Sequence, residues 1–154
     1  MPSPVHDHDK CIEDALSAAR DICTRRETRF TPLRRKVLEL VWNSHSPVSA
    51  YELLDMLSRD GRKRAAPPTI YRALDFLIEE GLVHRLESLN AFIGCPDPAH
   101  RHQGHFLICR SCRTVTEVND RTLMSHIAKT ARSHGYICEN SMLEIMGLCA
   151  DCRE

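Results

Sequence analysis

The chain has 154 residues, equal numbers of basic and acidic residues (21 each), and 42% apolar residues. This composition is typical of a globular protein, and the length suits one domain or two small ones. No apolar run reaches the roughly 18 residues of a membrane-spanning helix, and residues 1–9 lack the basic and apolar regions of a secretory signal. We therefore expect a cytoplasmic protein with no membrane partner.

Cysteines are unusually frequent in this chain, and its basic residues are unevenly distributed. Eight cysteines are many for a cytoplasmic protein of this size, and in a reducing compartment they are better read as metal ligands or small buried residues than as disulfides. Residues 20–72 contain 12 Lys and Arg against 6 Asp and Glu, whereas residues 89–154 contain 7 of each. The early segment is therefore where a DNA-binding surface is expected, although an ordinary solvated face would have the same excess.

Four helices are predicted in the first half of the chain, because apolar residues recur there at helical spacing after typical start signals. Thr31 before Pro32 is an N-cap followed by proline at the first helical position. Ser49 and Glu52 match the capping box, and Gly81 has the usual place of glycine after a helix. The predicted spans are about 11–25, 32–43, 50–60 and 67–80.

Two short strands are predicted after these helices, at 82–87 and 91–95, around a turn at Ser88-Leu89-Asn90. Three or four helices closed by a hairpin form the winged helix-turn-helix pattern, in which the third and fourth helices read DNA. We therefore assign residues 1–95 to a winged-helix DNA-binding domain.

The composition changes at residue 96, where a linker without apolar periodicity runs to residue 105. Strands are predicted beyond it at 106–109, 114–118, 136–138 and 142–148, with a helix between the cap Asp120 and the stop Gly135. Residues 96–154 would form a small second domain, which makes the whole chain α+β. A unit of about 59 residues has little core of its own, so pairing with a second copy is expected.

Two Cys-x-x-Cys pairs, Cys109 with Cys112 and Cys149 with Cys152, provide four thiols in the second domain. Two such pairs complete a tetrahedral structural zinc site, which would tie the end of this domain to its beginning. The alternative is a redox pair, but one reactive pair would not need the second. We interpret Cys11, Cys23 and Cys138 as core or free thiols.

Several segments resemble a known family. The run Ala-Pro-Pro-Thr-Ile-Tyr-Arg-Ala-Leu-Asp-Phe-Leu at 66–77 is similar to the recognition-helix motif of the ferric uptake regulator family. Thr-Arg-Phe-Thr-Pro-Leu-Arg at 28–34 and the two Cys-x-x-Cys pairs match the same family. Gly-Leu-Val-His-Arg-Leu-Glu-Ser at 81–88 and Gly-Leu-Cys at 147–149 resemble its zinc uptake regulator branch. The resemblance extends from about residue 15 to residue 152.

The resemblance implies a second, regulatory zinc ion, and hence two ions per protomer. Its ligands would be His84, Cys95, His102 and Glu117. Because members of the family differ in the linker, His105 first and His100 second are the alternatives to His102, and these spare histidines could also form a third metal site. One thiolate beside two imidazoles suits zinc better than iron or manganese.

The resemblance also implies a DNA-binding surface and a function. Tyr51 and Arg72 would contact base edges, since Arg suits guanine in the major groove. Thr69, Tyr71, Lys63 and Arg64 would lie near phosphates, where contacts position the protein without specifying sequence. The expected function is a repressor of zinc-uptake genes that binds operator DNA as a zinc-loaded homodimer. The alternative within the family is a regulator that responds to iron, manganese or peroxide.

Other classes of protein fit the sequence less well. A deaminase requires His-x-Glu and Pro-Cys-x-x-Cys, and a metalloprotease requires His-Glu-x-x-His, none of which occurs here. A zinc site with four protein ligands also leaves no position for a catalytic water. We therefore expect neither an enzyme nor a small-molecule substrate. A zinc-stabilised protein-interaction module remains a third possibility, but it does not account for the basic helix-turn-helix segment.

Overall fold

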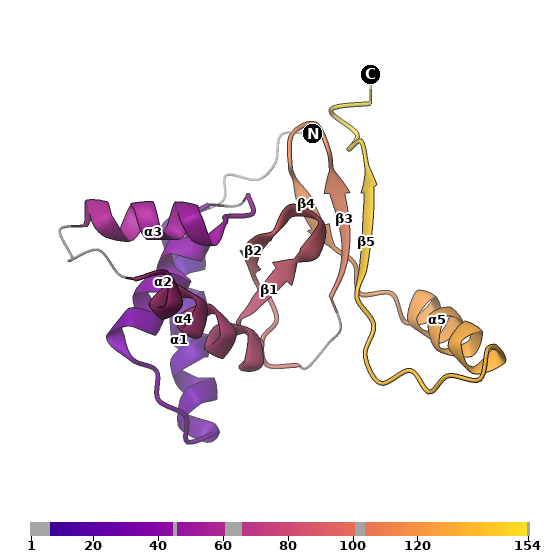
Figure 1. Ribbon diagram of the computed structural model, residues 1–154, viewed down its shortest axis with the longest axis horizontal. Coiled ribbons are helices and arrows are strands. Elements are labelled where there is room, and N and C mark those ends of the chain that lie inside the picture. The colour runs from indigo at the N-terminus through magenta and orange to yellow at the C-terminus, as the bar shows by residue number, and fades with distance from the viewer. Residues whose placement is uncertain (1–6, 45, 61–65, 101–103, 154) are drawn as a thin grey trace. The chain divides into compact units, whose positions relative to one another are not determined.

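The computed structural model describes residues 7–44, 46–60, 66–100 and 104–153. The chain divides into two compact units, Met1–Arg101 and His102–Glu154. The sequence placed the boundary after residue 95, and here residues 96–101 group with the first unit. Unit 1 is indigo to red and unit 2 orange to yellow in Figure 1. Among the described residues, no helix combines the length and the apolar character needed to cross a membrane.

Unit 1 contains the four predicted helices, which are α1 (His8–Arg25), α2 (Pro32–Trp42), α3 (Ala50–Arg59) and α4 (Pro67–Glu79). Helix α1 begins three residues before its predicted start. The reason is a cap that the apolar pattern did not identify: the Asp7 carboxylate accepts a hydrogen bond from the Lys10 backbone N–H at 3.3 Å.

The predicted caps of α2 and α3 are confirmed. Thr31 Oγ1 accepts a hydrogen bond from the Arg34 backbone N–H. Ser49 Oγ accepts from the Glu52 N–H at 3.2 Å, while the Glu52 carboxylate accepts from the Ser49 N–H at 2.7 Å. These reciprocal bonds satisfy backbone donors that helix formation leaves unpaired, and so they fix where α3 begins.

The wing of unit 1 is an antiparallel hairpin of β1 (Val83–Leu86) and β2 (Ala91–Gly94), joined through a short 3-10 helix at Glu87–Leu89. Asn90 closes the turn with φ of 46°, a left-handed conformation that Asn tolerates better than most residues. Val48 and Phe92 exchange two backbone hydrogen bonds. This bridge attaches the hairpin to the segment that leads into α3.

The core of unit 1 is formed by the apolar faces of the helices and the inward side of the wing. Helix α2 packs against α1, α3, α4 and β2. The core residues come from every one of these elements and include Leu16, Ile22, Val37, Leu38, Leu53, Leu57, Ile70, Leu74, Leu77, Val83 and Phe92. One face of helix α4 therefore packs into the core of unit 1, and its opposite face is available for other contacts.

Unit 2 contains β3 (His105–Cys109), β4 (Val115–Glu117), α5 (Arg121–Ser133) and β5 (Leu143–Gly147). The sheet order is β4-β3-β5, in which β3 pairs antiparallel with β4 and parallel with β5. Two parallel strands need a crossover between them, and α5 lies in the segment that makes it. No residue of α5 is buried in the single chain.

The prediction of a strand at 136–138 was wrong. Gly135 adopts φ of 82°, and the Tyr136 N–H returns to the Ala131 carbonyl oxygen at 2.9 Å, which is the usual glycine-containing end of a helix. Tyr136 and Ile137 are then 70% and 87% exposed. Strand-favouring side chains do not make a strand without a neighbouring backbone to pair with.

The close packing of Trp42 on the wing gives a stability prediction. A Cβ added to Gly94 would lie 2.3 Å from Cε2 of the Trp42 indole, so we expect Gly94→Ala to lower the free energy of unfolding by about 1–3 kcal/mol. Gly147→Ala is the matched control, because Gly147 also ends a strand and has open space around it. Urea unfolding followed by circular dichroism measures both, and equal effects would contradict the packing argument.

Candidate metal centres and DNA-binding surface

The two Cys-x-x-Cys turns meet at one end of the unit 2 sheet. Cys109 ends β3, and Cys149 follows β5 by two residues. Because β3 and β5 are parallel and Cys109 lies opposite Gly147, both turns emerge at the same edge. The sulfur atoms of Cys109, Cys112, Cys149 and Cys152 all lie within 4.8 Å of one another.

The geometry of these sulfurs fits a tetrahedral zinc ion. Zinc–sulfur bonds of about 2.3 Å place the sulfurs of a tetrahedron about 3.8 Å apart. Cys112 Sγ and Cys149 Sγ are 3.6 Å apart, far beyond the length of about 2.05 Å for a disulfide bond. None of the eight cysteines, all of which lie in the described part of the chain, forms a disulfide bond.

Backbone and side-chain donors tune these thiols before any ion binds. The Cys112 backbone N–H, followed by that of Cys149, stabilises the thiolate of Cys109 and lowers its pKa to about 6. The Thr114 hydroxyl lowers the pKa of Cys112. In contrast, the adjacent sulfurs, Cys149 first, raise the pKa of Cys152 to about 12. The cluster thus ionises in part by itself, and a bound cation is needed to ionise it fully.

The second ligand set begins at the base of the wing. His84 is on β1, and Cys95 follows β2 directly, where its backbone N–H donates to the Leu82 carbonyl oxygen at 3.0 Å. A ring nitrogen of His84 and the sulfur of Cys95 lie within 4.8 Å of each other. Cys95 is 3% exposed and His84 is half-buried. The hairpin register therefore places a thiol and an imidazole of unit 1 side by side.

The other predicted ligands of the regulatory ion belong to unit 2. Glu117 ends β4, opposite Phe106 of β3, and is half-buried. His102 lies outside the described residues. Of its two alternatives, His105 is buried with Nε2 at 3.0 Å from Ser141 Oγ, and His100 Nδ1 lies 2.9 Å from Asp97 Oδ1. Each alternative therefore has one ring nitrogen already in contact with a neighbour.

The predicted DNA-binding residues lie on the exposed sides of α3 and α4. Tyr51, at the start of α3, is 80% exposed, and Tyr71 of α4 is 49% exposed. Thr69 and Arg72 are also exposed on the first two turns of α4. That first turn has no acidic residue that would repel a phosphate. Pro67 and Pro68 have no backbone N–H and the Thr69 N–H donates to the Ala66 carbonyl oxygen at 2.9 Å, so side chains rather than backbone donors are presented there. Lys63 and Arg64 lie outside the described residues.

Two supporting contacts were not identified from the sequence. Thr114 lies two residues after Cys112, with Oγ1 3.1 Å from the sulfur, and a hydroxyl so near a Cys-x-x-Cys pair is a usable signal. The guanidinium carbon of Arg34 lies 3.7 Å from the centre of the Phe76 ring and braces α4 against α2. No local pattern links two residues so far apart in the chain.

Comparison with known proteins identifies the family. Residues 25–146 match the profile described as the Ferric uptake regulator family. The zinc uptake regulation protein of Escherichia coli (strain K12) is 38% identical over 145 residues, which cover 92% of this chain and 83% of that protein.

Two solved structures show the same architecture. A zinc uptake regulator complexed with zinc and DNA superposes with a TM-score of 0.85 at 37% identity, covering 91% of this chain and 93% of that one. The crystal structure of holo XcZur gives a TM-score of 0.80 at 42% identity, with 88% and 94% covered. The chain therefore belongs to the ferric uptake regulator family and, within it, to the branch of the zinc uptake regulators.

Proposed function

We propose that this chain is a zinc-responsive transcriptional repressor of the cytoplasm, which binds double-stranded operator DNA as a homodimer and represses zinc-uptake genes. The relatives are regulation proteins, and one solved relative is a complex with zinc and DNA. The observation in this chain that carries the proposal is the pairing of His84 with Cys95 at the base of the wing.

The chemistry of that pair favours zinc over the metals of the alternative regulators. A thiolate next to an imidazole is a soft donor set, whereas iron and manganese sensors depend more on His and carboxylate ligands. Cys95 is almost fully buried beside His84, and a thiol in that place would be a poor ligand for manganese. Operator binding measured at buffered free zinc, with iron and manganese as controls, tests the assignment directly.

We infer two zinc ions per protomer with different roles. The four-cysteine ion closes unit 2 by joining the turn after β3 to the segment after β5. The regulatory ion would be bound by His84 and Cys95, together with Glu117 and His102. This ligand set includes residues of both units, so an ion held by all four would restrict their relative motion.

A shift between two arrangements of the protein is then enough to explain regulation. Moving a population from 1% to 99% in the active arrangement requires about 5.5 kcal/mol of differential binding energy. Structural zinc sites supply about 10–16 kcal/mol. A regulatory site of lower affinity therefore has enough energy to control DNA binding.

The proposed DNA contacts follow from the exposed residues of α3 and α4. Tyr51 and Arg72 would reach base edges. Thr69 and Tyr71, with Lys63 and Arg64 from the preceding loop, would contact phosphates. The buried face of α4 packs on α2 and α3, so that its exposed residues are presented from a rigid support.

Exposed apolar surface in unit 2 supports the homodimer. The side chains of Leu107, Ile145, Met146 and Leu148 are 42–48% exposed on and beside the sheet, where Leu107, Ile145 and Leu148 line a hollow of about 350 Å³. The apolar stripe of α5 is only half-buried. A second copy of unit 2 would cover surface that a unit of this size cannot bury by itself.

The regulatory site is tested by Cys95→Ser. We expect the variant to keep its four-cysteine zinc and its dimeric state and to lose zinc-dependent operator binding, because the soft ligand of the regulatory ion is gone. Cys138→Ser is the control, since Cys138 lies outside both ligand sets. Zinc content, sizing and fluorescence anisotropy on operator DNA measure the outcomes. An unchanged zinc dependence in Cys95→Ser would refute the ligand assignment.

The four-cysteine site is tested by proton release. Zinc binds thiolates, so each ligand that is still protonated must release its proton on binding. Because the pKa of Cys109 is about 6, this thiol is mostly ionised at pH 7.5, and we expect fewer than four protons per ion there. Lowering the pH from 7.5 to 5.5 should increase the release, since Cys109 then also holds its proton. Titrating metal-free protein with zinc in the presence of a pH indicator measures the release. An equal number of protons released per ion at the two pH values would contradict the prediction.

The base contact is tested by Arg72→Ala. We expect operator affinity to fall by about 1–3 kcal/mol and discrimination at one base pair to relax, as for the loss of an Arg–guanine contact. Arg20→Ala, which removes an equal charge from the exposed side of α1, is the matched control. Loss of affinity without any change in sequence preference would instead assign Arg72 to a phosphate.

A further inference from the structure

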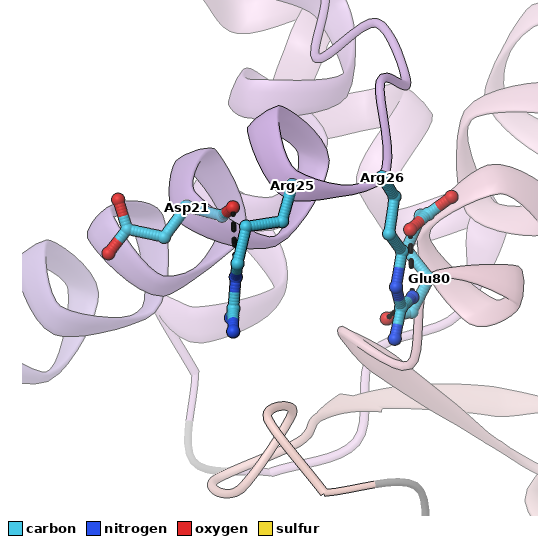
Figure 2. A network of polar contacts seen from close by, with 4 residues as sticks. All are labelled: Asp21, Arg25, Arg26 and Glu80. Atoms are coloured by element: carbon cyan, nitrogen blue, oxygen red, sulfur yellow. Dashed lines mark hydrogen bonds and ion pairs between the residues drawn. The ribbon is translucent and has the colours of Figure 1, made fainter.

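One guanidinium nitrogen joins the ends of two helices in unit 1. Arg26 Nη1 donates to Glu80 Oε2 at 2.8 Å and to the Glu80 carbonyl oxygen at 3.1 Å (Figure 2). Arg26 is the C-cap residue that directly follows α1, and Glu80 is the C-cap residue that directly follows α4. This contact therefore ties the carboxyl end of the proposed recognition helix to α1.

The tied residue begins the turn that leads to the proposed regulatory ligands. Gly81 follows Glu80 with φ of 74°, and the Leu82 N–H returns to the Leu77 carbonyl oxygen at 2.8 Å, so the turn is compact. The Leu82 carbonyl oxygen accepts the backbone N–H of Cys95, and His84 comes two residues later on β1. One short segment thus connects α4 to both ligands from unit 1.

Burial makes this ion pair different from an ordinary surface pair. The side chain of Glu80 is 10% exposed and that of Arg26 is 33% exposed. Exposed ion pairs contribute little, whereas removing one partner of a desolvated pair leaves a charge without compensation. Arg26 also supplies a donor to a helix-terminal carbonyl group, which α4 cannot satisfy internally.

We propose that Arg26 is a positioning residue for zinc-responsive DNA binding, acting through Glu80 to hold the turn between α4 and β1 so that the recognition helix and the regulatory ligands move together. This inference rests on the proposed function. It adds a connection between the two proposed sites. Arg26 and Glu80 belong neither to the proposed zinc ligands nor to the proposed DNA contacts.

The measured quantity is the zinc response, defined as the operator Kd without regulatory zinc divided by the operator Kd at saturating zinc. It is determined on the full-length dimer with the four-cysteine zinc retained, at a temperature where every variant is folded. We expect Arg26→Gln and Glu80→Gln each to reduce the zinc response by roughly twofold to thirtyfold, the range for residues that carry coupling between sites. The double variant should be no worse than the more severe single one, because both changes remove the same contact.

Neighbouring residues provide matched controls. Among the described residues, the Arg25 side chain donates only to the Asp21 carbonyl oxygen, at 3.4 Å, on the exposed side of α1 (Figure 2). Glu79, one residue before Glu80, is exposed. Arg25→Gln and Glu79→Gln make the same charge changes as the two test variants and should leave the zinc response unchanged.

The effect of DNA on zinc affinity provides a second readout, which a loss of stability alone would not change. The factor by which zinc strengthens DNA binding equals the factor by which DNA strengthens zinc binding. Competition with a zinc chelator, with and without operator DNA, should therefore show the same reduction in Arg26→Gln. If Arg26→Gln and Glu80→Gln lower only the unfolding midpoint and keep the full zinc response, the inference is wrong and the proposed function stands. A wild-type protein with no zinc response would contradict the proposed function itself.

Discussion

The parallel pairing of β3 with β5 is the interaction on which unit 2 depends. It aligns the carboxyl ends of two strands that are separated by more than 30 residues of chain, and each end continues into a Cys-x-x-Cys turn. If β5 paired antiparallel, its following turn would lie at the opposite end of the sheet and four sulfurs could not converge. The strand pairing positions the ligands, and a zinc ion bound by them would in turn fix the pairing, so fold and metal stabilise each other.

The four thiols also show why a cation belongs in this place. Hydrogen bonds to Cys109 favour its ionised form, and the same accumulation of negative charge disfavours ionisation of Cys152. The arrangement is therefore preorganised for a cation but unfavourable without one. The wing has a different arrangement, because unit 1 would supply only His84 and Cys95 to the proposed regulatory site, and two ligands cannot complete a zinc site. This contrast supports the proposal of a stable ion in unit 2 and a conditional ion at the wing.

Much of this fold could be predicted from the sequence, because its signals are local. The capping box at Ser49 and the proline after Thr31 fixed two helix starts, and the Cys-x-x-Cys spacing indicated the zinc cluster. Where local signals gave the wrong result, a neighbouring group decided the outcome. Asp7 extended α1, and the residues after Gly135 had no backbone partner to make a strand. The Arg26–Glu80 pair spans 54 residues, and only the folded helices bring it together.

The packing of Trp42 on Gly94 has a practical consequence. The chain contains one tryptophan, and its indole lies against the residue that directly precedes Cys95. Any rearrangement of the wing that accompanies metal capture would change the surroundings of this ring. The molecule therefore contains an intrinsic fluorophore beside its proposed sensor, and emission from unlabelled protein could report occupancy of that site in real time.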